Sequence, residues 1–393
     1  MRKLLMISFD AIGDDVYDRL VQRSPHFARL AEKSQVHRSV SSIFLTNTYP
    51  VHTCIATGRT PKHHGLVNNT HPFPSRHPKW CYDASRIKAK TLWQAAAEKG
   101  LSSAAVMWPV TAGAREITYN IPELLAQPGE NQILLNLKYG SPLLQAHMLL
   151  KYGKLLGGKG INQPEIDFFS TACMTYILKK KAPVLAMMHL TAYDFICHKH
   201  GLNSPALEAA YEAIDKNLDA LLDAANERYD ILLFSDHSQL PAANPILPNL
   251  LLAERSYIRT DESGEYMPGE CFFECCGGSA FLHPGELSLE QIAELKDAVQ
   301  TLEGFGRILN TDEMDMCGRA QFPFGFAALP GWACEAYQST EKANHGYPAD
   351  YNNYKVFYLC YGDGFKPGLI HGGTLLELTT HAAATLDLDM NLD

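Results

Sequence analysis

The sequence predicts an α/β fold in which a mainly parallel central sheet is flanked by helices, with a small α+β cap inserted late in the chain. Two observations support this prediction. Short apolar runs alternate with segments of helical periodicity, which is typical of βαβ units. The chain also has 393 residues, 46% of them hydrophobic and 20% charged, so it is long enough for one large domain with a smaller inserted element.

The first half of the chain supplies the beginning of the sheet. Its expected elements are a strand at 3–9, a helical segment at 15–33, a helix at 91–99 and a strand at 102–107. Gly100 is a stop signal for the third of these elements. Residues 110–160 show no regular pattern, so we expect an irregular excursion over the surface there.

The second half continues the alternation and contains the cap. The expected elements are a helix at 165–180, a strand at 184–189, a helix at 205–225, strands at 230–234 and 354–361, and a closing helix at 374–386. Residues 245–335 fit this alternation poorly, with a strand at 279–282, a helix at 288–302 and turn-rich connections. We therefore expect a catalytic core formed by 1–244 and 336–393, with 245–335 as the cap.

Composition excludes several classes of partner. The net charge is -9 and no long basic run occurs, which argues against a nucleic-acid-binding surface. No run reaches the roughly 18 apolar residues of a membrane span, so we expect no membrane segment. The ten cysteines are scattered without paired CxxC spacing, which favours reduced thiols and a cytoplasmic location. The oligomeric state is not predicted.

Three expected strands end in residues that bind metal ions. Asp10 follows the first strand, Asp236 and His237 follow the strand at 230–234, and the strand at 184–189 leads to Asp194 and His198. Ligands of open α/β sheets bind beyond the carboxyl ends of the strands. The spacing of Asp194 and His198 places both on one helix face, and mixed carboxylate and imidazole ligands suit zinc, manganese or iron. The sequence thus predicts a metal centre at this edge.

Thr48 is the candidate nucleophile. It precedes a helical pattern that runs to Thr57, so its hydroxyl lies at a helix N-terminus, where positive potential favours a phosphate. A hydroxyl at such a position is commonly only a cap. A neighbouring cation lowers the pKa of the hydroxyl and makes it a strong nucleophile, so the predicted metal centre favours a catalytic role.

Four segments, in order along the chain, resemble the type I phosphodiesterase/nucleotide pyrophosphatase family of the alkaline phosphatase superfamily. Thr46-Asn47-Thr48-Tyr49-Pro50 resembles that family's Thr-Lys-Thr-Phe-Pro. Residues 57–69 resemble its Thr-Gly-x-x-Pro-x-x-His-Gly-Ile-x-x-Asn. Ser235-Asp236-His237 resembles its Ser-Asp-His-Gly, and Asn344-His345-Gly346-Tyr347 resembles its late His-Gly segment. The resemblance covers nearly the whole chain, only loosely at 245–335.

The resemblance implies an alkaline-phosphatase-like sandwich and a role for each matching residue. One divalent cation is expected at Asp194, His198 and His345, and the other at Asp10, Asp236, His237 and the Thr48 oxygen. The cations are expected to be zinc, with manganese as the alternative. The resemblance further implies that Thr48 attacks phosphorus to give a phospho-threonine and that Asn69, or failing it Asn68, donates to a phosphoryl oxygen. The substrate is expected to be a small phosphoester such as a nucleotide.

Other residues and activities remain open at this stage. Tyr49 could stack on a substrate base or pack in the core, Trp80 and Tyr82 could form a substrate wall, and His371 is a rival to His345. Val51 and Ser238 depart from the family's Asn and Gly, and His52 stands where sulfatases and phosphonate monoester hydrolases carry Arg. The alternatives to a phosphodiesterase are a phosphomonoesterase, a phosphonoacetate-type C–P hydrolase, a di-manganese phosphomutase and a non-catalytic binding protein.

Overall fold

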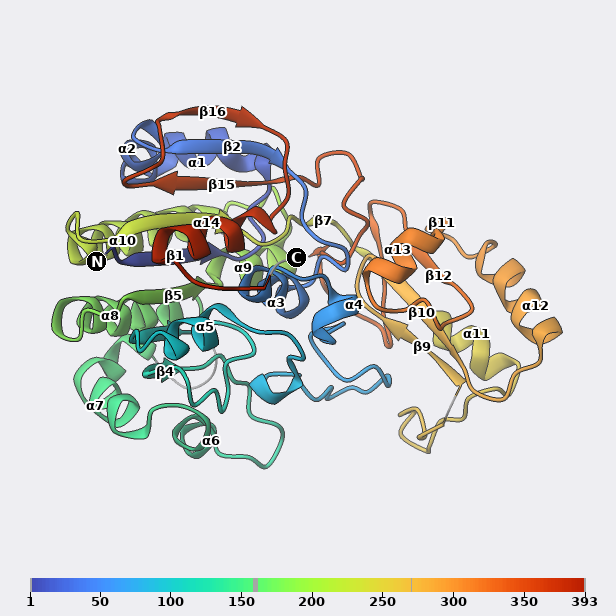
Figure 1. The fold of residues 1–393 in the computed structure, drawn as a ribbon. Coiled ribbons are helices and arrows are strands. Elements are labelled where there is room, and N and C mark those ends of the chain that lie inside the picture. The colour runs from blue at the N-terminus through green and yellow to red at the C-terminus, as the bar shows by residue number, and fades with distance from the viewer. Residues whose placement is uncertain (1, 158–161, 270, 392–393) are drawn as a thin grey trace.

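The computed structural model describes residues 2–157, 162–269 and 271–391 and has two lobes (Figure 1). The larger lobe contains the central sheet. Its strands, in spatial order, are β16 (Gly368–His371), β2 (Gln35–Val40), β15 (Val356–Tyr361), β6 (Asp230–Ser235), β1 (Leu4–Phe9), β5 (Leu185–Leu190), β3 (Ser103–Val106) and β4 (Tyr119–Ile121). Only β15 among these strands runs against its neighbours, so the prediction of a mainly parallel sheet is confirmed.

Side chains of β1 alternate between the two faces of this sheet, because successive residues of a strand point to opposite sides. Leu5, Ile7 and Phe9 pack into one core cluster, and Leu4 and Met6 into the other. The first cluster is covered by α1 (Tyr17–Arg23), α2 (Pro25–Glu32), α8 (Glu165–Lys180), α9 (Ala192–His200) and α10 (Leu207–Ala225). The second cluster is covered by α3 (Thr48–Thr57), α5 (Leu92–Glu98) and α14 (Glu377–Leu386). The lobe is therefore a three-layer sandwich.

The smaller lobe is built on an antiparallel sheet that falls inside residues 245–335. Its strands, in order, are β11 (Phe305–Ile308), β12 (Gly325–Ala328), β10 (Ser279–Pro284) and β9 (Cys271–Cys275). Its helices are α11 (Pro248–Glu254), α12 (Leu289–Val299) and α13 (Thr311–Met316). This lobe has its own core, including Phe273 and Phe326.

Two short pairings connect this lobe to the rest of the chain. β13 (Trp332–Cys334) pairs with β8 (Asn244–Ile246), and β14 (Ala343–Asn344) pairs with β7 (Leu240–Pro241). The remaining elements are α4 (Pro61–His64), α6 (Gln132–Tyr139), α7 (Pro142–Tyr152) and the 3-10 turns at Asp14–Val16, Ala84–Arg86 and Gly153–Leu156. No helix of the described ranges has both the length and the apolarity needed to cross a bilayer.

Two expectations about elements were wrong. The helical segment at 15–33 is broken between α1 and α2, because Pro25 cannot continue the first helix and Ser24 caps the second through Phe27 N. The stretch at 110–160 is not irregular, since it contains β4, α6 and α7. In α7, Leu143 and Leu150 are 88% and 89% exposed, so apolar residues on the solvent side blur the periodicity that would have revealed the helix.

Candidate metal centre

The candidate ligands lie at one edge of the central sheet, where β1, β5 and β6 end. In the register of these parallel strands, Phe9 pairs with Leu190 on β5 and with Ser235 on β6. Asp10 and Asp236 follow directly, so they leave the sheet side by side. At the same edge β5 leads into α9, which carries two more ligands.

Six side chains form two clusters of three, and within each cluster the ligand atoms lie within 4.8 Å of one another. The buried cluster is Asp10, Asp236 and His237, and the half-buried cluster is Asp194, His198 and His345. The clusters are adjacent, because the ring centroids of His237 and His345 are 4.2 Å apart. The structure thus brings together all six predicted ligands, in the two sets that the resemblance implies.

Unpartnered carboxylate oxygens show that the buried cluster suits a cation. Asp236 Oδ1 accepts hydrogen bonds from Ala11 N at 3.2 Å and His237 N at 2.9 Å. Asp236 Oδ2 and Asp10 Oδ1 are buried without a hydrogen-bond partner among the described residues. A buried carboxylate oxygen without a partner is costly, and a divalent cation is the partner that this donor set fits.

The electrostatics of the buried cluster also favour a cation. Burial, together with repulsion from Asp194 and Asp236, raises the pKa of Asp10 well above its usual value. Burial raises the pKa of Asp236 to about 7 and lowers that of His237 to about 4. Attraction from His189 only partly offsets the burial of these carboxyl groups, while the His237 imidazole is neutral at pH 7 and can offer a lone pair.

Thr48 lies beside the buried cluster as the first residue of α3. Its side chain is buried, and its Oγ1 lies 3.2 Å from His237 Nε2. The helix N-terminus contributes positive potential at the same place. The hydroxyl is therefore positioned to reach both a cation held by the buried cluster and a phosphoryl group in front of α3.

Asn69 rather than Asn68 has a free amide. Asn69 Oδ1 accepts from Tyr49 N at 2.8 Å, which fixes the orientation of the side chain at the start of α3. Its Nδ2 has no hydrogen-bond partner within the described parts of the chain and can donate to a ligand. Asn68 Nδ2 instead donates to Glu274 Oε1 at 2.9 Å, and its Oδ1 accepts from Asn47 Nδ2 at 3.0 Å. The geometry therefore favours Asn69 as the phosphoryl donor.

A second layer of polar groups orients the ligands of the half-buried cluster. Asn47 Oδ1 lies 2.8 Å from His345 Nδ1, and Glu341 Oε2 lies 3.1 Å from His198 Nδ1. Gln239 Nε2 donates to Asp194 Oδ1. A hydrogen-bond partner such as Asn47 selects the tautomer and holds the ring orientation of a metal-binding histidine, while Glu341 contributes a negative charge beside His198. The contacts from Asn47 and Glu341 are both made to Nδ1, so the Nε2 atoms of His345 and His198 are left for a cation.

The residues that contact the ligand side chains were not predicted from the sequence. Two of them had a weak sequence signal for a role at the site, because Asn47 is next to Thr48 and Glu341 is four residues before His345. His189, the penultimate residue of β5, had no signal that separated it from a core residue. Its Nε2 lies 3.3 Å from Asp10 Oδ2 and its Nδ1 lies 3.6 Å from Glu123 Oε2. Although burial opposes protonation, these two carboxylates raise the pKa of His189.

The remaining candidates lie outside the two clusters. Tyr49 is 1% exposed and packs against Trp80, with ring centroids 5.3 Å apart. Trp80 and Tyr82 are only half-buried, so they, and not Tyr49, present aromatic surface to solvent. His371 is exposed on the edge strand β16 and is not part of either cluster, which removes it as a rival to His345. Substrate contact by Tyr49 remains a prediction.

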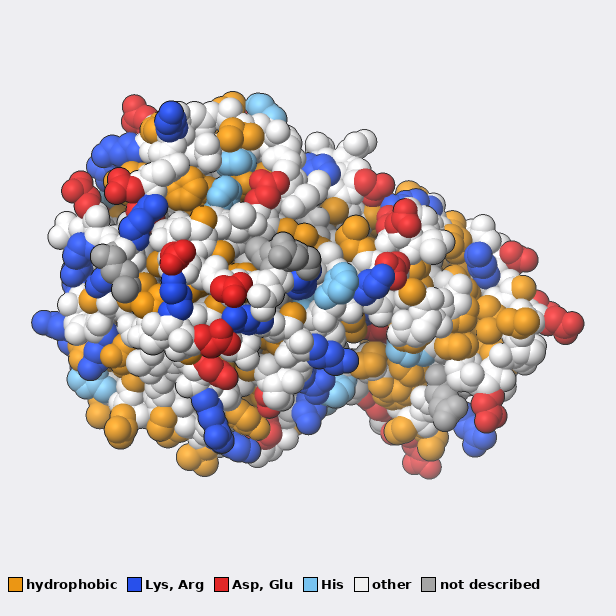
Figure 2. Space-filling view, in the orientation of Figure 1, with side chains coloured by type: hydrophobic (Ala, Val, Ile, Leu, Met, Phe, Trp, Pro, Cys, Tyr) orange, Lys and Arg blue, Asp and Glu red, His pale blue; other side chains and the backbone are white. Residues whose placement is uncertain are grey.

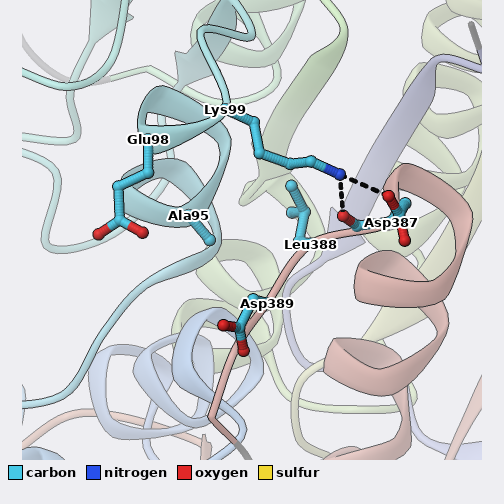
Figure 3. A pocket seen from close by; sticks show the side chains of 6 residues that line it. All are labelled: Ala95, Glu98, Lys99, Asp387, Leu388 and Asp389. Carbon is cyan, nitrogen blue, oxygen red and sulfur yellow. Dashed lines mark hydrogen bonds and ion pairs between the residues drawn. The ribbon is translucent and has the colours of Figure 1, made fainter.

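A surface pocket of about 340 Å³ lies away from this centre (Figure 3). It is formed by α5 and the segment after α14, and Lys99 Nζ donates to Asp387 Oδ2 at 2.6 Å across it. None of its lining residues is a member of either ligand cluster. The sheet edge therefore remains the candidate site.

Comparison with known proteins extends the resemblance to most of the chain. Residues 4–348 match the family model described as type I phosphodiesterase / nucleotide pyrophosphatase. Human ectonucleotide pyrophosphatase/phosphodiesterase family member 5 is 30% identical over 117 residues, 28% of this chain and 24% of that protein. Human bis(5'-adenosyl)-triphosphatase ENPP4 is 30% identical over 119 residues, 28% of this chain and 25% of that protein. These matches span about a quarter of the curated relatives.

Solved structures share the fold across almost the entire chain. Human ectonucleotide pyrophosphatase/phosphodiesterase 5 superposes with a TM-score of 0.71 at 18% identity, covering 99% of this chain and 96% of that chain. An inactive threonine-to-alanine variant of the murine protein, in complex with AMP, gives a TM-score of 0.68 at 18% identity with the same coverage. The predicted fold class is therefore confirmed. Since the family model covers 345 residues from Leu4 to Pro348, this chain belongs to the type I phosphodiesterase/nucleotide pyrophosphatase family.

Proposed function

We propose that this protein is a hydrolase that cleaves phosphodiester or pyrophosphate bonds of nucleotides through a phospho-threonine at Thr48. The observation that carries the proposal is the position of Thr48 Oγ1, 3.2 Å from His237 Nε2, at the junction of a helix N-terminus and two ligand clusters. A hydroxyl needs no special surroundings to cap a helix. Placement beside side chains that can hold a cation is what an activated hydroxyl nucleophile requires, because the cation lowers the pKa of the hydroxyl.

Two divalent cations would be held by Asp10, Asp236 and His237 and by Asp194, His198 and His345. When bound, they supply charge neutralisation for the attacking and leaving oxygens. Zinc suits these ligands best, and manganese is the alternative.

The chain's own groups account for the rest of the reaction. Thr48 Oγ1 forms a bond to phosphorus as the bond to the leaving oxygen breaks, and the leaving group departs with a proton. Asn69 Nδ2 donates to a phosphoryl oxygen, so it stabilises charge that develops there. Water then attacks phosphorus from the opposite side, the bond to Thr48 Oγ1 breaks, and the threonine hydroxyl is restored.

The names of two relatives support nucleotides as the substrates. ENPP4 is named for hydrolysis of bis(5'-adenosyl) triphosphate, and the murine structure contains AMP. Half-buried Trp80 and Tyr82 are aromatic surfaces on which a base could stack. We also propose a cytoplasmic location, which the ten free cysteines support.

The test is a comparison of substrates by the purified, zinc-loaded protein. We expect faster hydrolysis of bis-p-nitrophenyl phosphate than of p-nitrophenyl phosphate, and cleavage of diadenosine triphosphate to AMP and ADP. The reverse preference between the two nitrophenyl esters would favour a monoesterase. Binding of AMP without hydrolysis of any of the three substrates would favour a non-catalytic protein.

A further inference from the structure

A second group of metal-binding side chains lies outside the candidate active site. His37 on β2, Cys360 on β15 and His381 on α14 each offer a ligand atom within 4.8 Å of the other two. β2 and β15 are antiparallel neighbours, with His37 opposite Tyr358. Cys360 is two residues beyond Tyr358 and so shares its face, the face that α14 covers.

The two histidines present unused nitrogens. His37 is 6% exposed, and its Nε2 lies 3.3 Å from Gln35 Oε1, to which it can donate. This leaves His37 Nδ1 as an acceptor, and that atom is buried without a partner in the described structure. His381 Nε2 is likewise buried and unpartnered. One ring nitrogen held by an amide oxygen and the other left free is the arrangement of a metal-binding histidine.

The surroundings hold the ligands in place. The Tyr358 ring stacks on His37, with centroids 4.1 Å apart and planes 16° apart. The Tyr358 hydroxyl donates to Glu377 Oε2 at 2.7 Å, which fixes the strand to α14 one turn before His381. Burying unpaired imidazole nitrogens is costly, and nothing else in the described chain satisfies them.

We propose that His37, Cys360 and His381 form a zinc site separate from the catalytic clusters, which ties α14 to the central sheet. Two imidazoles and a thiolate are ligands that zinc prefers, with a fourth position left for water because His381 is only half-buried. Binding replaces the thiol proton, so one proton is released as the sulfur–zinc bond forms. Burial alone keeps the thiol protonated, since it raises the pKa of Cys360 to about 12.

Cobalt distinguishes this site from the active site, because a cobalt–thiolate pair absorbs in the near ultraviolet and neither catalytic cluster contains a cysteine. The full chain is stripped with a chelator and titrated with Co²⁺. We expect a thiolate charge-transfer band whose final intensity corresponds to one thiolate-bound cobalt per chain. Cys360→Ser should abolish the band and lower bound zinc by one per chain, whereas Cys173→Ser, which alters a buried thiol outside the cluster, should change neither.

A second variant tests the site in case Cys360→Ser fails to fold. His381 is half-buried, so His381→Gln should fold and should weaken the cobalt affinity of the thiolate band at least tenfold. Absence of the band in the unaltered chain, or an unchanged band in Cys360→Ser or His381→Gln, would overturn the proposal. The catalytic metals and hydrolysis do not enter this readout.

Discussion

Asp236 illustrates how one side chain of the proposed cation site is held in place. Two backbone amides hold Oδ1, Ser42 Oγ donates to its carbonyl oxygen at 2.6 Å, and Oδ2 is left facing the cluster. The side chain therefore cannot rotate to find another partner. Its position after β6 could be predicted because a strand end fixes where the next residue lies, whereas two of these hydrogen bonds depend on Ala11 and Ser42, which are distant in sequence.

Zinc affinity should depend on the proton that Asp236 retains. Burial raises its pKa from 3.8 to about 7, so below pH 7 zinc must displace a proton from the folded chain. His237 releases its proton near pH 4 and does not compete in this range. We expect affinity to rise from pH 5 towards pH 7, by up to about tenfold per pH unit for the Asp236 proton. Chelator competition at several pH values measures this, and an affinity independent of pH between 5 and 7 would contradict it.

Asn69 should contribute to turnover through its donor atom Nδ2 and to the stability of α3 through its acceptor atom Oδ1. Asn69→Asp keeps an oxygen for Tyr49 N but replaces the free NH₂ with a negative oxygen. We expect kcat to fall about 100- to 1,000-fold, the cost of losing one oxyanion donor. Thermal unfolding should be nearly unchanged for Asn69→Asp and lower for Asn69→Ala. Equal kcat values for Asn69→Asp and the unaltered chain would exclude the proposed donor.

At the scale of elements, a buried hydrogen-bond relay links the smaller lobe to the half-buried cluster. His345 contacts Asn47, Asn47 donates to Asn68, and Asn68 donates to Glu274 on β9. Glu274 is 2% exposed and pairs with Arg319, which is fully buried, at 2.5 Å. The relay joins β9 to the loop before α3, so the smaller lobe helps to position the ligand histidine.

The relay could not be predicted from the sequence, and β9, one of the elements that it joins, was not predicted either. Asn68 and Glu274 are 206 positions apart, and no local pattern pairs them. The helix at 165–180 matches α8, whose acidic first turn and whose lysines at 179 and 180 in the last turn are local signals of helix ends. The helices α6 and α7 were missed since their apolar residues do not keep to one face.

Removing the Glu274 charge should destabilise the fold. Glu274→Gln leaves a buried guanidinium unpaired, so we expect a loss of about 3 kcal/mol in the free energy of unfolding. Adding Arg319→Met should restore more than half of that loss. The control is Glu265→Gln, which breaks a partly exposed pair with Arg76 and should cost under about 1 kcal/mol. Denaturant unfolding of the four proteins measures these values, and a neutral Glu274→Gln would contradict the account.

At the scale of the whole molecule, the two lobes meet at the carboxyl edge of the sheet (Figure 1). On the face of the molecule that Figure 2 shows, basic, acidic and apolar side chains of the described residues are mixed. The α/β class and the strand-end ligands could be predicted because both follow from periodicity and from the geometry of parallel sheets. How the smaller lobe packs against the sheet depends on contacts between distant segments, and so does substrate selection.

The central claim is that Thr48 attacks phosphorus beside two cations. The most direct test compares kcat and bound zinc for Thr48→Ala and for Thr53→Val, which alters a buried threonine of the same helix whose hydroxyl only donates to Tyr49 O. We predict that Thr48→Ala lowers kcat at least about 1,000-fold while bound zinc stays the same, and that Thr53→Val keeps both. A Thr48→Ala protein that retains most of its turnover would contradict the account.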